Sequence, residues 1–375
     1  MQKMVLESYD RTLERQGAID KIKSMVWTRR YWSPGELKLL VPFSSSAFEL
    51  LSRSTFIAKP GDDELAEIRY INIVQNKKGE EWLKVHGRFL TRWIKKRLVL
   101  APIVTTDRPQ NIIHRIVREN IIQPTNPRRR IGNITAMNVA GIERGTIDYA
   151  SEPLENALLA CETVAKNSKL GFKIFTNLRE RTHHFKVYAG QDLTAGQNIN
   201  TPCIFKEDFD NIREQEYIDS DENHRTTAYV GGEERDETPR RIVEVGQTAS
   251  GLDREEIFVN ASDVRQNFRD GDGQEISLTN AQVDELLRQR GVENLEHFKK
   301  VLSYSAKIKP KSNLVYKTDY DLGDRVTCIN HRWGVQINVR ITEVTEIYQK
   351  NSADIEITFG ESLPTLIESL RRLKN

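Results

Sequence analysis

The sequence contains histidines and cysteines, which commonly bind metals, but neither residue type is spaced for a metal site. His183 and His184 are adjacent in a segment that favours a strand, where neighbouring side chains point to opposite faces and cannot easily hold one ion. Cys161, Cys203 and Cys328 are far apart and odd in number, which fits neither zinc ligands nor a disulfide framework. We therefore expect structural histidines and three buried free thiols in a protein made in a reducing compartment.

An acidic, glycine-rich segment from Asp270 to Glu275 resembles the beginning of a calcium-binding loop. An EF-hand loop requires glycine at its sixth position and a bidentate glutamate at its twelfth, and here these positions hold Glu275 and Ala281. Asp–Gly turns are also common without a metal. The sequence therefore predicts no EF-hand, and it leaves Asp270 and Asp272 as a weak candidate for a looser calcium site.

The sequence contains no recognisable catalytic constellation. Ser44, Ser45 and Ser46 lack the Gly-x-Ser-x-Gly surroundings of a nucleophile elbow. There is no Walker A loop, no His-Glu-x-x-His motif and no glycine-rich dinucleotide fingerprint. Carboxylates are plentiful, but none of their pairs can be distinguished from a solvated surface. We therefore expect neither an enzyme nor a cofactor.

Three aromatic or charged segments could instead contact a polymer. The run from Trp27 to Trp32 could stack on bases or sugars, but a strand with aromatic groups on both faces is more often buried on both. The arginines of 128–130 could bind phosphate, although such a loop is more often solvated. The acidic stretch from Lys206 to Glu237 would usually be solvated surface, and it would also suit a channel that DNA passes without adhering.

The composition is that of a soluble globular protein large enough to form its own cores. Of the 375 residues, 38% are hydrophobic and 29% are charged, and the formal net charge is +2. This near-neutral balance gives no global argument for binding nucleic acid or an anionic membrane. The N-terminus lacks the apolar core of a signal peptide, and no apolar run approaches the roughly 20 residues that span a bilayer. We expect two or three domains, at roughly 100–200 residues each, in a chain synthesised in the cytosol.

The first half of the sequence predicts strands interrupted by short helices. Segments rich in β-forming residues alternate with Gly and Pro turns over residues 1–100. A capping box of Ser46 and Glu49 predicts a short helix, and Asp107 with Pro109 predicts another that runs to about residue 120. The remaining elements predicted here are a helix over 152–167 and paired strands over 172–176 and 183–188.

The second half predicts further strands and ends in a β-meander. A capping box at Thr279 predicts a helix that ends at Gly291, followed by a second helix over 295–302. Apolar and polar residues alternate over 335–342 and again over 355–359, which is typical of strands with one buried face. Further strands are expected over 211–220, 225–230, 240–245 and 324–330, and a terminal helix over 364–373. The predicted fold class is α+β, predominantly β, without an evident internal sequence repeat.

Several of these segments occur in an order that is informative. An Asp-Leu-Gly-Asp turn within Tyr320–Thr327 leads into the strand Ile341–Tyr348 and then into a strand that ends in Phe-Gly at 359–360. Gly251–Val259 and Trp27–Trp32 lie in the middle and at the beginning of the chain. Together these segments resemble the phage tail-hub family of siphophages and prophages of Gram-positive bacteria, in its Siphovirus ReqiPepy-type tail-protein branch. More distantly, they are similar to contractile-tail baseplate hubs.

The resemblance implies two tail-tube-like antiparallel β-barrel domains with an inserted α/β domain and short helices. Residues 1–104 would form the first hub barrel and residues 105–200 the inserted domain. Residues 201–310 would supply a β-rich segment with a helical pair to the second domain, and residues 311–375 its closing meander and terminal helix. The candidate structural or assembly residues are Asp321, Gly323, Asp324, Trp27 and Trp32.

The resemblance also implies a structural role at the tail tip or baseplate. Hub proteins of this kind look like homotrimeric rings that continue the tail tube and let DNA pass without specific binding. Their partners would be distal tail and tail-tube proteins, the tape measure protein, and receptor-binding or fibre proteins. The protein would be made in the host cytoplasm and located at the virion tail tip. Some relatives carry a C-terminal peptidase or lysin domain, which we do not expect here because the chain ends at Asn375. The alternatives are a tail-associated cell-wall-degrading enzyme and a carbohydrate- or calcium-binding adhesin.

Overall fold

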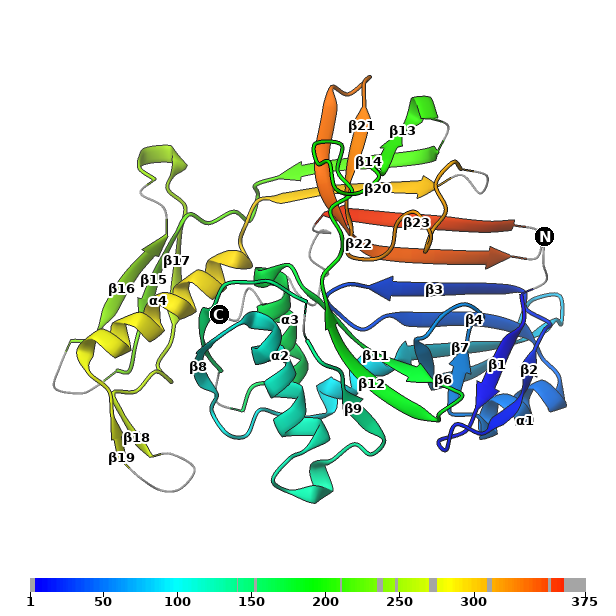
Figure 1. Ribbon diagram of the computed structural model, residues 1–375. Helices are drawn as coiled ribbons and strands as arrows, with labels where there is room; N and C mark the ends of the chain where they lie inside the picture. Colours follow the sequence, from blue (N-terminus) through cyan, green and yellow to red (C-terminus); the bar gives the residue numbers. More distant parts are fainter. Residues whose placement is uncertain are drawn as a thin grey trace.

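The structure is a computed structural model, and it describes residues 4–139, 141–151, 154–209, 211–234, 239–246, 249–269, 275–308, 312–349 and 352–360. Most of the regular structure in these residues is β-strand, with four α-helices between the strands (Figure 1). The predicted class, α+β and predominantly β, is confirmed. Asp270, Asp272 and the terminal helix expected over 364–373 lie outside the described residues.

The N-terminal part forms a sheet because its strands alternate apolar and polar residues. On the strand Glu36–Pro42, for example, Leu37, Leu39 and Val41 are buried while Lys38 is exposed. The elements of this part are β1 (Leu6–Tyr9), β2 (Arg15–Ile19), β3 (Ser24–Arg30), β4 (Glu36–Pro42), α1 (Ser45–Arg53), β5 (Phe56–Ala58), β6 (Leu65–Gln75), β7 (Glu81–Phe89) and a 3-10 helix (Leu90–Lys96).

The middle part packs helices on a small three-stranded sheet. Strand β12 pairs antiparallel with β11 and parallel with β9, and only the β11–β12 pair was predicted from the sequence. The elements are β8 (Val104–Asp107), α2 (Pro109–Val117) with a π turn (Arg118–Ile122), a 3-10 turn (Pro127–Arg129), β9 (Ile134–Ala136), β10 (Ile147–Ala150), α3 (Ala157–Ser168), β11 (Gly171–Asn177) and β12 (Thr182–Tyr188).

The C-terminal part returns to the main sheet after a small separate lobe. The lobe packs α4 on the sheet β16-β15-β17, and the predicted closing meander is present as β21, β22 and β23. The elements are β13 (Ile204–Lys206), a 3-10 turn (Glu207–Phe209), β14 (Ile212–Ser220), β15 (Thr227–Gly231), β16 (Ile242–Gly246), a 3-10 turn (Gly251–Asp253), β17 (Glu256–Asn260), β18 (Asn267–Arg269), β19 (Glu275–Ser277), α4 (Asn280–Glu296), β20 (Val301–Ile308), β21 (Arg325–Asn330), β22 (Val335–Gln349) and β23 (Ser352–Gly360).

Several predicted helix boundaries and one predicted helix are wrong. Helix α3 begins at Ala157 rather than at residue 152, and the N-cap of α2 is Arg108 rather than Asp107. Helix α1 is capped by Ser44 rather than Ser46. Helix α4 continues through Gly291. The glycine lets the helix pack closely on the sheet, since a side chain there would touch both Val230 and Val245, and it does not end the helix. The second helix of the expected pair does not form. Instead β20 begins at Val301, since this segment fits between β14 and β23 with its alternate side chains in the core.

The N- and C-terminal parts are joined into one sheet. Eight consecutive strands, which we call the wall, run in the order β14-β20-β23-β22-β3-β4-β7-β6, and every neighbouring pair is antiparallel. At its centre β3 pairs with β22 over seven residues, from Ser24–Gln349 to Arg30–Glu343 (Figure 1). The hydrophobic cores of both parts lie on the same face of the wall, because Trp27 of one part and Ile355 of the other occupy one cross-strand row.

The wall contains a repeat that is not evident in the sequence. Its first four strands follow the chain order β14, β20, β22, β23, and its last four follow β3, β4, β6, β7. In both sets the last two strands are swapped, so that the third strand in chain order lies at the end of the set and the fourth lies inside it. All neighbouring pairs are antiparallel, so the strand directions of the two sets also match. Each chain therefore presents two equivalent four-stranded modules side by side, related by a shift along the wall.

Candidate assembly junction

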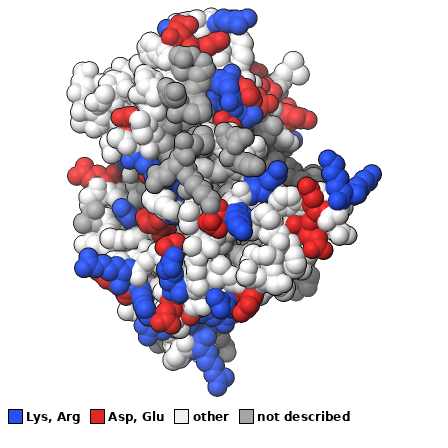
Figure 2. Space-filling model, turned by 90° about the vertical axis from the view of Figure 1, so that its right-hand side faces the viewer, with Lys and Arg blue, Asp and Glu red and all other residues white. Residues whose placement is uncertain are grey.

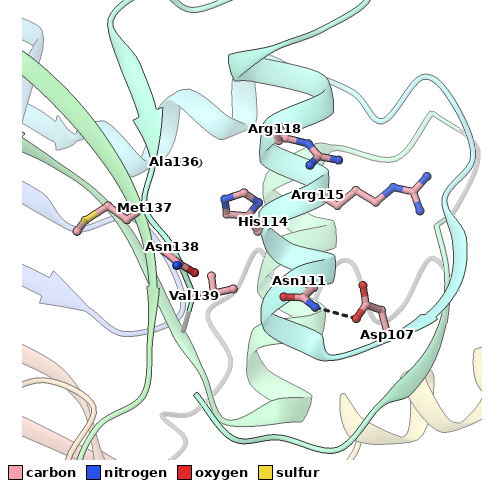
Figure 3. Close-up of a pocket in the computed structure, with 9 residues that line it drawn as sticks. All are labelled: Asp107, Asn111, His114, Arg115, Arg118, Ala136, Met137, Asn138 and Val139. Atoms are coloured by element: carbon pink, nitrogen blue, oxygen red, sulfur yellow. Dashed lines mark hydrogen bonds between the residues drawn. The ribbon is translucent and has the colours of Figure 1, made fainter. Parts of the chain in front are cut away.

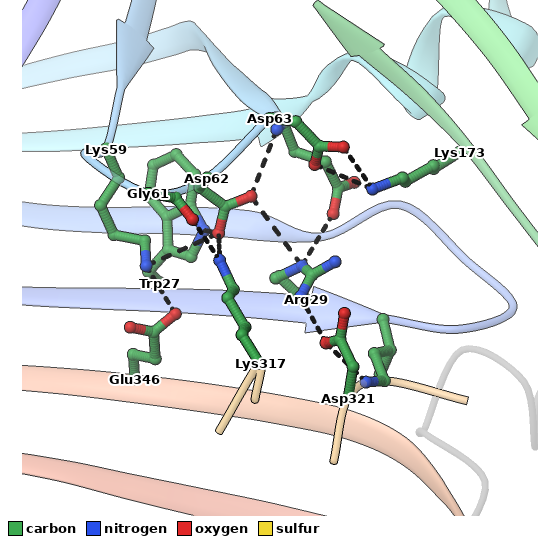
Figure 4. A network of polar contacts seen from close by, with 12 residues as sticks. Trp27, Arg29, Lys59, Gly61, Asp62, Asp63, Lys173, Lys317, Asp321 and Glu346 are labelled. Carbon is green, nitrogen blue, oxygen red and sulfur yellow. Dashed lines mark hydrogen bonds and ion pairs between the residues drawn. The ribbon is translucent and has the colours of Figure 1, made fainter. Parts of the chain in front are cut away.

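A cluster of charged side chains, most of them buried, lies where the modules meet the rest of the chain. We call it the polar junction, and it consists of Arg29, Lys59, Asp62, Glu64, Lys317, Asp321 and Glu346 (Figure 4). Strand β3 supplies Arg29, the loop between β5 and β6 supplies the acidic pair, and β22 supplies Glu346. The cluster therefore ties residues near position 60 to residues near 320 and 346.

Arg29 is the centre of this cluster. Its side chain is 5% exposed, and its guanidinium donates to Glu64 at 3.0 Å, to Asp321 at 2.9 Å and to the hydroxyl of Tyr316 at 2.7 Å. A buried charge is stable only when it is paired and hydrogen-bonded in this way. The planar, forked guanidinium can bind acceptors in several directions at once, which a lysine could not do.

Asp62 is the second centre, and its side chain is fully buried. It accepts hydrogen bonds from the indole N–H of Trp27 at 3.1 Å and from Lys317 at 3.0 Å, and Lys59 lies 3.5 Å away. Lys59 also donates to Glu346 of β22 at 2.6 Å. Trp27 is thus held by a polar contact as well as by its fully buried ring.

The charges of the junction shift the pKa values of its two buried acids in opposite directions. Burial by itself would raise the pKa of Asp62, but Arg29, Lys317 and Lys59 together outweigh it and lower the pKa to about 2. Burial dominates at Glu64 and raises its pKa, because Arg29 opposes it without matching the desolvation cost. Asp62 is therefore ionised throughout the physiological range.

The acidic run Asp62, Asp63 and Glu64 brings three carboxylates within 4.8 Å of one another, a spacing that a cation could use. Each carboxylate already has a cationic partner, however. Asp63 pairs with Lys173 of β11 at 2.7 Å, while Lys317 and Arg29 pair with the other two. Lysine and arginine thus supply the positive charge that a metal would supply, and the arrangement fits a structural ion network.

A second contact, which we call the Tyr31 socket, lies beside the polar junction. The Tyr31 ring is fully buried where Gly171 and Gly323 approach it so closely that a Cβ on either would lie 2.3 Å from the ring. Its hydroxyl lies 3.2–3.3 Å from the carbonyls of Lys169 and Tyr188, and the Arg340 guanidinium lies 5.5 Å from the ring centre. The socket therefore joins the end of β3 to the middle part and to the Asp-Leu-Gly-Asp turn.

The Asp-Leu-Gly-Asp turn is held by its own second aspartate. Asp324 accepts from the backbone N–H of Gln191 at 2.7 Å and of Asp321 at 2.8 Å. Burial raises the pKa of Asp324, and the backbone N–H groups oppose this shift. Gly323 has φ +98°, a conformation that favours glycine, and its carbonyl accepts from Arg340.

Four of the five residues singled out in the sequence fall in these two contacts. Asp321 belongs to the polar junction, and Trp27 donates a hydrogen bond to its Asp62. Gly323 lines the Tyr31 socket, and Asp324 holds the turn that contains Gly323. Trp32 lies beside the Tyr31 socket, with its ring centre 5.7 Å from that of Tyr31 and Lys169 5.6 Å from its ring, and its indole N–H has no hydrogen-bond acceptor among the described residues.

Sequence reasoning missed most of the ion network and Tyr31. The available signal was Arg29, which is two residues after Trp27 in a strand and must therefore share its buried face. The interpretation of Trp27–Trp32 as a buried segment agrees with the burial of Trp27 and Tyr31. Those two rings are not available for stacking on a ligand.

An open hollow of about 520 Å³ lies between α2 and the segment after β9 (Figure 3). Asn111 donates to Asp107 at its rim, and His114 faces Asn138 and Val139 across it. Burial, with a smaller contribution from Arg118, lowers the pKa of His114. The lining residues of this hollow do not form a recognisable catalytic or metal-binding set.

Three solved structures share this fold along nearly the whole chain. The tail protein from Neisseria meningitidis MC58 aligns with a TM-score of 0.54 at 12% identity, covering 96% of this chain and 97% of its own. The 43 kDa tail protein of prophage MuSo2 from Shewanella oneidensis aligns with 0.53 at 10%, covering 96% and 97%. The prophage tail protein gp18 from Listeria monocytogenes EGD-e aligns with 0.52 at 8%, covering 99% and 98%. The fold is that of prophage tail proteins.

The sequence itself identifies the family. Residues 5–361 match the Siphovirus ReqiPepy6 Gp37-like protein family, and the chain belongs to this family of phage tail proteins. No curated protein matches the sequence. The family that the sequence motifs predicted is therefore confirmed, and the virion tail is the location that it implies. Within the described residues, no helix has the length and apolar character to cross a membrane.

Proposed function

We propose that this protein is a structural tail-hub subunit and that three copies close into a ring that continues the tail tube. The observation that supports this proposal is the repeat in the wall, two four-stranded modules with the same strand order and directions. When a sheet made of repeated modules curves, each module is rotated about a common axis relative to the one before it, and enough modules close the sheet into a barrel. Three copies would place six such modules around that axis, which matches the symmetry of a hexameric tube.

The two contacts at the centre of the chain suit this role mechanically. The polar junction binds β3 and β22 through Arg29, Lys59 and Glu346, and the Tyr31 socket adds the middle part. In this arrangement each buried charge has a partner, and a different angle between β3 and β22 would leave some of these charges unpaired. Such a network would hold the two modules at the fixed angle that ring closure needs.

The face of the wall opposite the cores suits the lining of a DNA channel. Its charges are paired across strands: Arg30 with Glu343 at 2.6 Å, Arg88 with Glu36 at 2.6 Å, and Lys307 with Glu214 at 2.5 Å. At one end of the molecule, too, basic and acidic groups are interspersed (Figure 2). Cations that are paired with carboxylates bind backbone phosphates less readily, so DNA would pass with little adhesion. The acidic β14 belongs to the stretch whose charge would suit a channel wall, and it would form part of this lining.

The proposal is tested by the mass of the purified protein. Light scattering at micromolar concentration should give three times the 43.3 kDa of one chain for the protein alone, or a mass that corresponds to three copies of it in a mixture with a distal tail protein. Electron microscopy of that species should show a ring with a central hole. A protein that stays at the mass of one chain under both conditions and is absent from tail particles would overturn the proposal.

The hub assignment includes no catalytic role. A zymogram with peptidoglycan in the gel should therefore show no clearing at the position of this protein. A clearing band would favour the alternative of a tail-associated cell-wall-degrading enzyme.

A further inference from the structure

Both ends of the wall carry strand edges without a strand partner among the described residues. Strand β14 pairs only with β20, which leaves the outer edge of Ile212–Ser220 free. Strand β6 is covered on its outer side by β5 only over Leu65–Glu67, and its later part, 69–75, pairs only with β7. Free edges of this length readily pair with another chain.

The chain contains its own template for joining these two edges. In the repeat, β14 is equivalent to β3 and β6 is equivalent to β22. Strands β3 and β22 pair antiparallel over seven residues, with the beginning of β3 beside the end of β22. The same joint between copies would place the beginning of β14 beside the end of β6.

We propose that β14 of one copy pairs antiparallel with residues 69–75 of β6 in the next copy, and that this joint closes the ring. The inference rests on the proposed hub function and adds the surface, the partner strand and the direction of pairing. Both segments are long enough, since seven residues of a strand span about 23 Å and β14 has nine residues.

The side chains at the two edges support this pairing. The β6 edge carries large apolar groups that are unusually exposed, Tyr70 at 51% and Ile73 at 46%. The β14 edge carries Tyr217 and Ile218, both half-buried, beside the exposed acids Glu214 and Glu216. Basic Arg69 on β6 and Lys84 on the neighbouring β7 would oppose these acids. Pairing of the two edges would cover the apolar groups and bring opposite charges together.

Disulfide trapping tests the joint directly. The two edges lie seven strand spacings apart in one chain, roughly 34 Å along the sheet, so a disulfide between them can form only between copies. Double variants would combine Glu216→Cys with Arg69→Cys, Tyr70→Cys, Asn72→Cys or Val74→Cys, which samples the register. The three native cysteines are buried and need not be removed. Glu216→Cys with Glu49→Cys, which places the second thiol on α1, serves as the control.

At least one of the four pairs should yield covalent dimers and trimers under oxidation, while the control pair and Glu216→Cys alone should not. Trimers that form but are not trapped by any of the four pairs would overturn the joint and leave the hub function standing. Trapping by Glu216→Cys alone would indicate a symmetric β14–β14 contact and would also overturn it. If every variant and the unmodified protein remain monomeric, the ring and the joint both fail.

A charge reversal provides a second readout that does not depend on register. Glu216→Lys should weaken trimer formation by about tenfold or more, the effect of roughly 1.4 kcal/mol, measured as the concentration at which half the chains assemble. Glu49→Lys changes the net charge equally on exposed α1 and should leave that concentration unchanged. An equal effect of both variants would contradict the proposed surface.

Discussion

At the scale of residues, the molecule is organised around one buried arginine. Arg29 holds acids from two distant loops, and each of these contacts spans a different length of chain, from 35 to 292 residues. A buried pair of this kind need not stabilise the fold more than a hydrophobic contact would. Removing one member would, however, leave the other members as buried charges without a partner.

Arg29→Met tests this dependence. The substitution leaves Glu64 buried without its cation, so we expect a loss of about 3–5 kcal/mol in the free energy of unfolding. Urea denaturation followed by tryptophan fluorescence measures it. Arg15→Met removes the exposed pair with Glu7 and should cost less than about 1 kcal/mol. Similar losses in both variants would show that the polar junction is not a structural centre.

Gly323→Ala tests the Tyr31 socket. The backbone conformation at φ +98° and the 2.3 Å approach to Tyr31 both oppose a side chain. Gly334→Ala is the matched control, because Gly334 also has positive φ but has open space around it. We expect about 1–2 kcal/mol of destabilisation for the control and about 1–3 kcal/mol more for Gly323→Ala. Equal unfolding midpoints in thermal melts would refute close packing around Tyr31.

At the scale of elements, strand β12 shows how burial turns a candidate metal ligand into a core residue. His183 is 3% exposed, its ring packs edge-on against Trp93, and its Nδ1 is 2.9 Å from the hydroxyl of Thr176. His184, on the opposite face, lies near Thr135 and Thr182. The two imidazoles thus lie on opposite faces of β12, as the alternation of a strand predicts.

The burial of His183 should make stability depend on pH. Burial, with a smaller contribution from His184, lowers the pKa of His183 from its usual 6.5 to about 4. The unfolded chain then binds the proton first, so this contribution to stability is complete above pH 6.5 and is lost as the pH falls toward 4. The loss should approach about 3 kcal/mol. His183→Gln should abolish this dependence of stability on pH. The difference in unfolding free energy between the unmodified protein and the variant should therefore become smaller from pH 7 to pH 4. A constant difference would contradict a buried neutral imidazole.

At the scale of the whole molecule, the joint between β3 and β22 decides whether the two modules behave as one body. Seven paired residues and the polar junction connect them. We therefore expect the modules to unfold together, so that amides of β7 and β23 exchange hydrogen at similar rates.

Thr345→Pro tests this coupling. Proline in a central strand cannot donate to the ladder, and Thr345 faces Thr28 across the joint. Mass spectrometry of the variant should show exchange in β23 becoming faster than exchange in β7. Two results would refute cooperative coupling through the joint. One is that the exchange rates of β7 and β23 stay equal in the variant; the other is that they already differ in the unmodified protein.

The sequence by itself determined the β-rich class, the closing meander and the family. Alternation along β22 and β23 is a local signal with period two, and the Asp-Leu-Gly-Asp turn is a short motif, so both can be recognised without knowing any distant neighbour. The end of α4 could not be predicted from the sequence, because Gly291 is a site of close contact with Val230 and Val245 rather than a helix stop.

Only the tertiary structure decided the polar junction, the Tyr31 socket and the repeat of the wall. The partners in the first two are separated by up to about 300 residues, and a single sequence carries no record of which charge meets which. The two modules need share no residues to share an architecture. A wall strand requires only an apolar face and a polar face, and many sequences satisfy that condition.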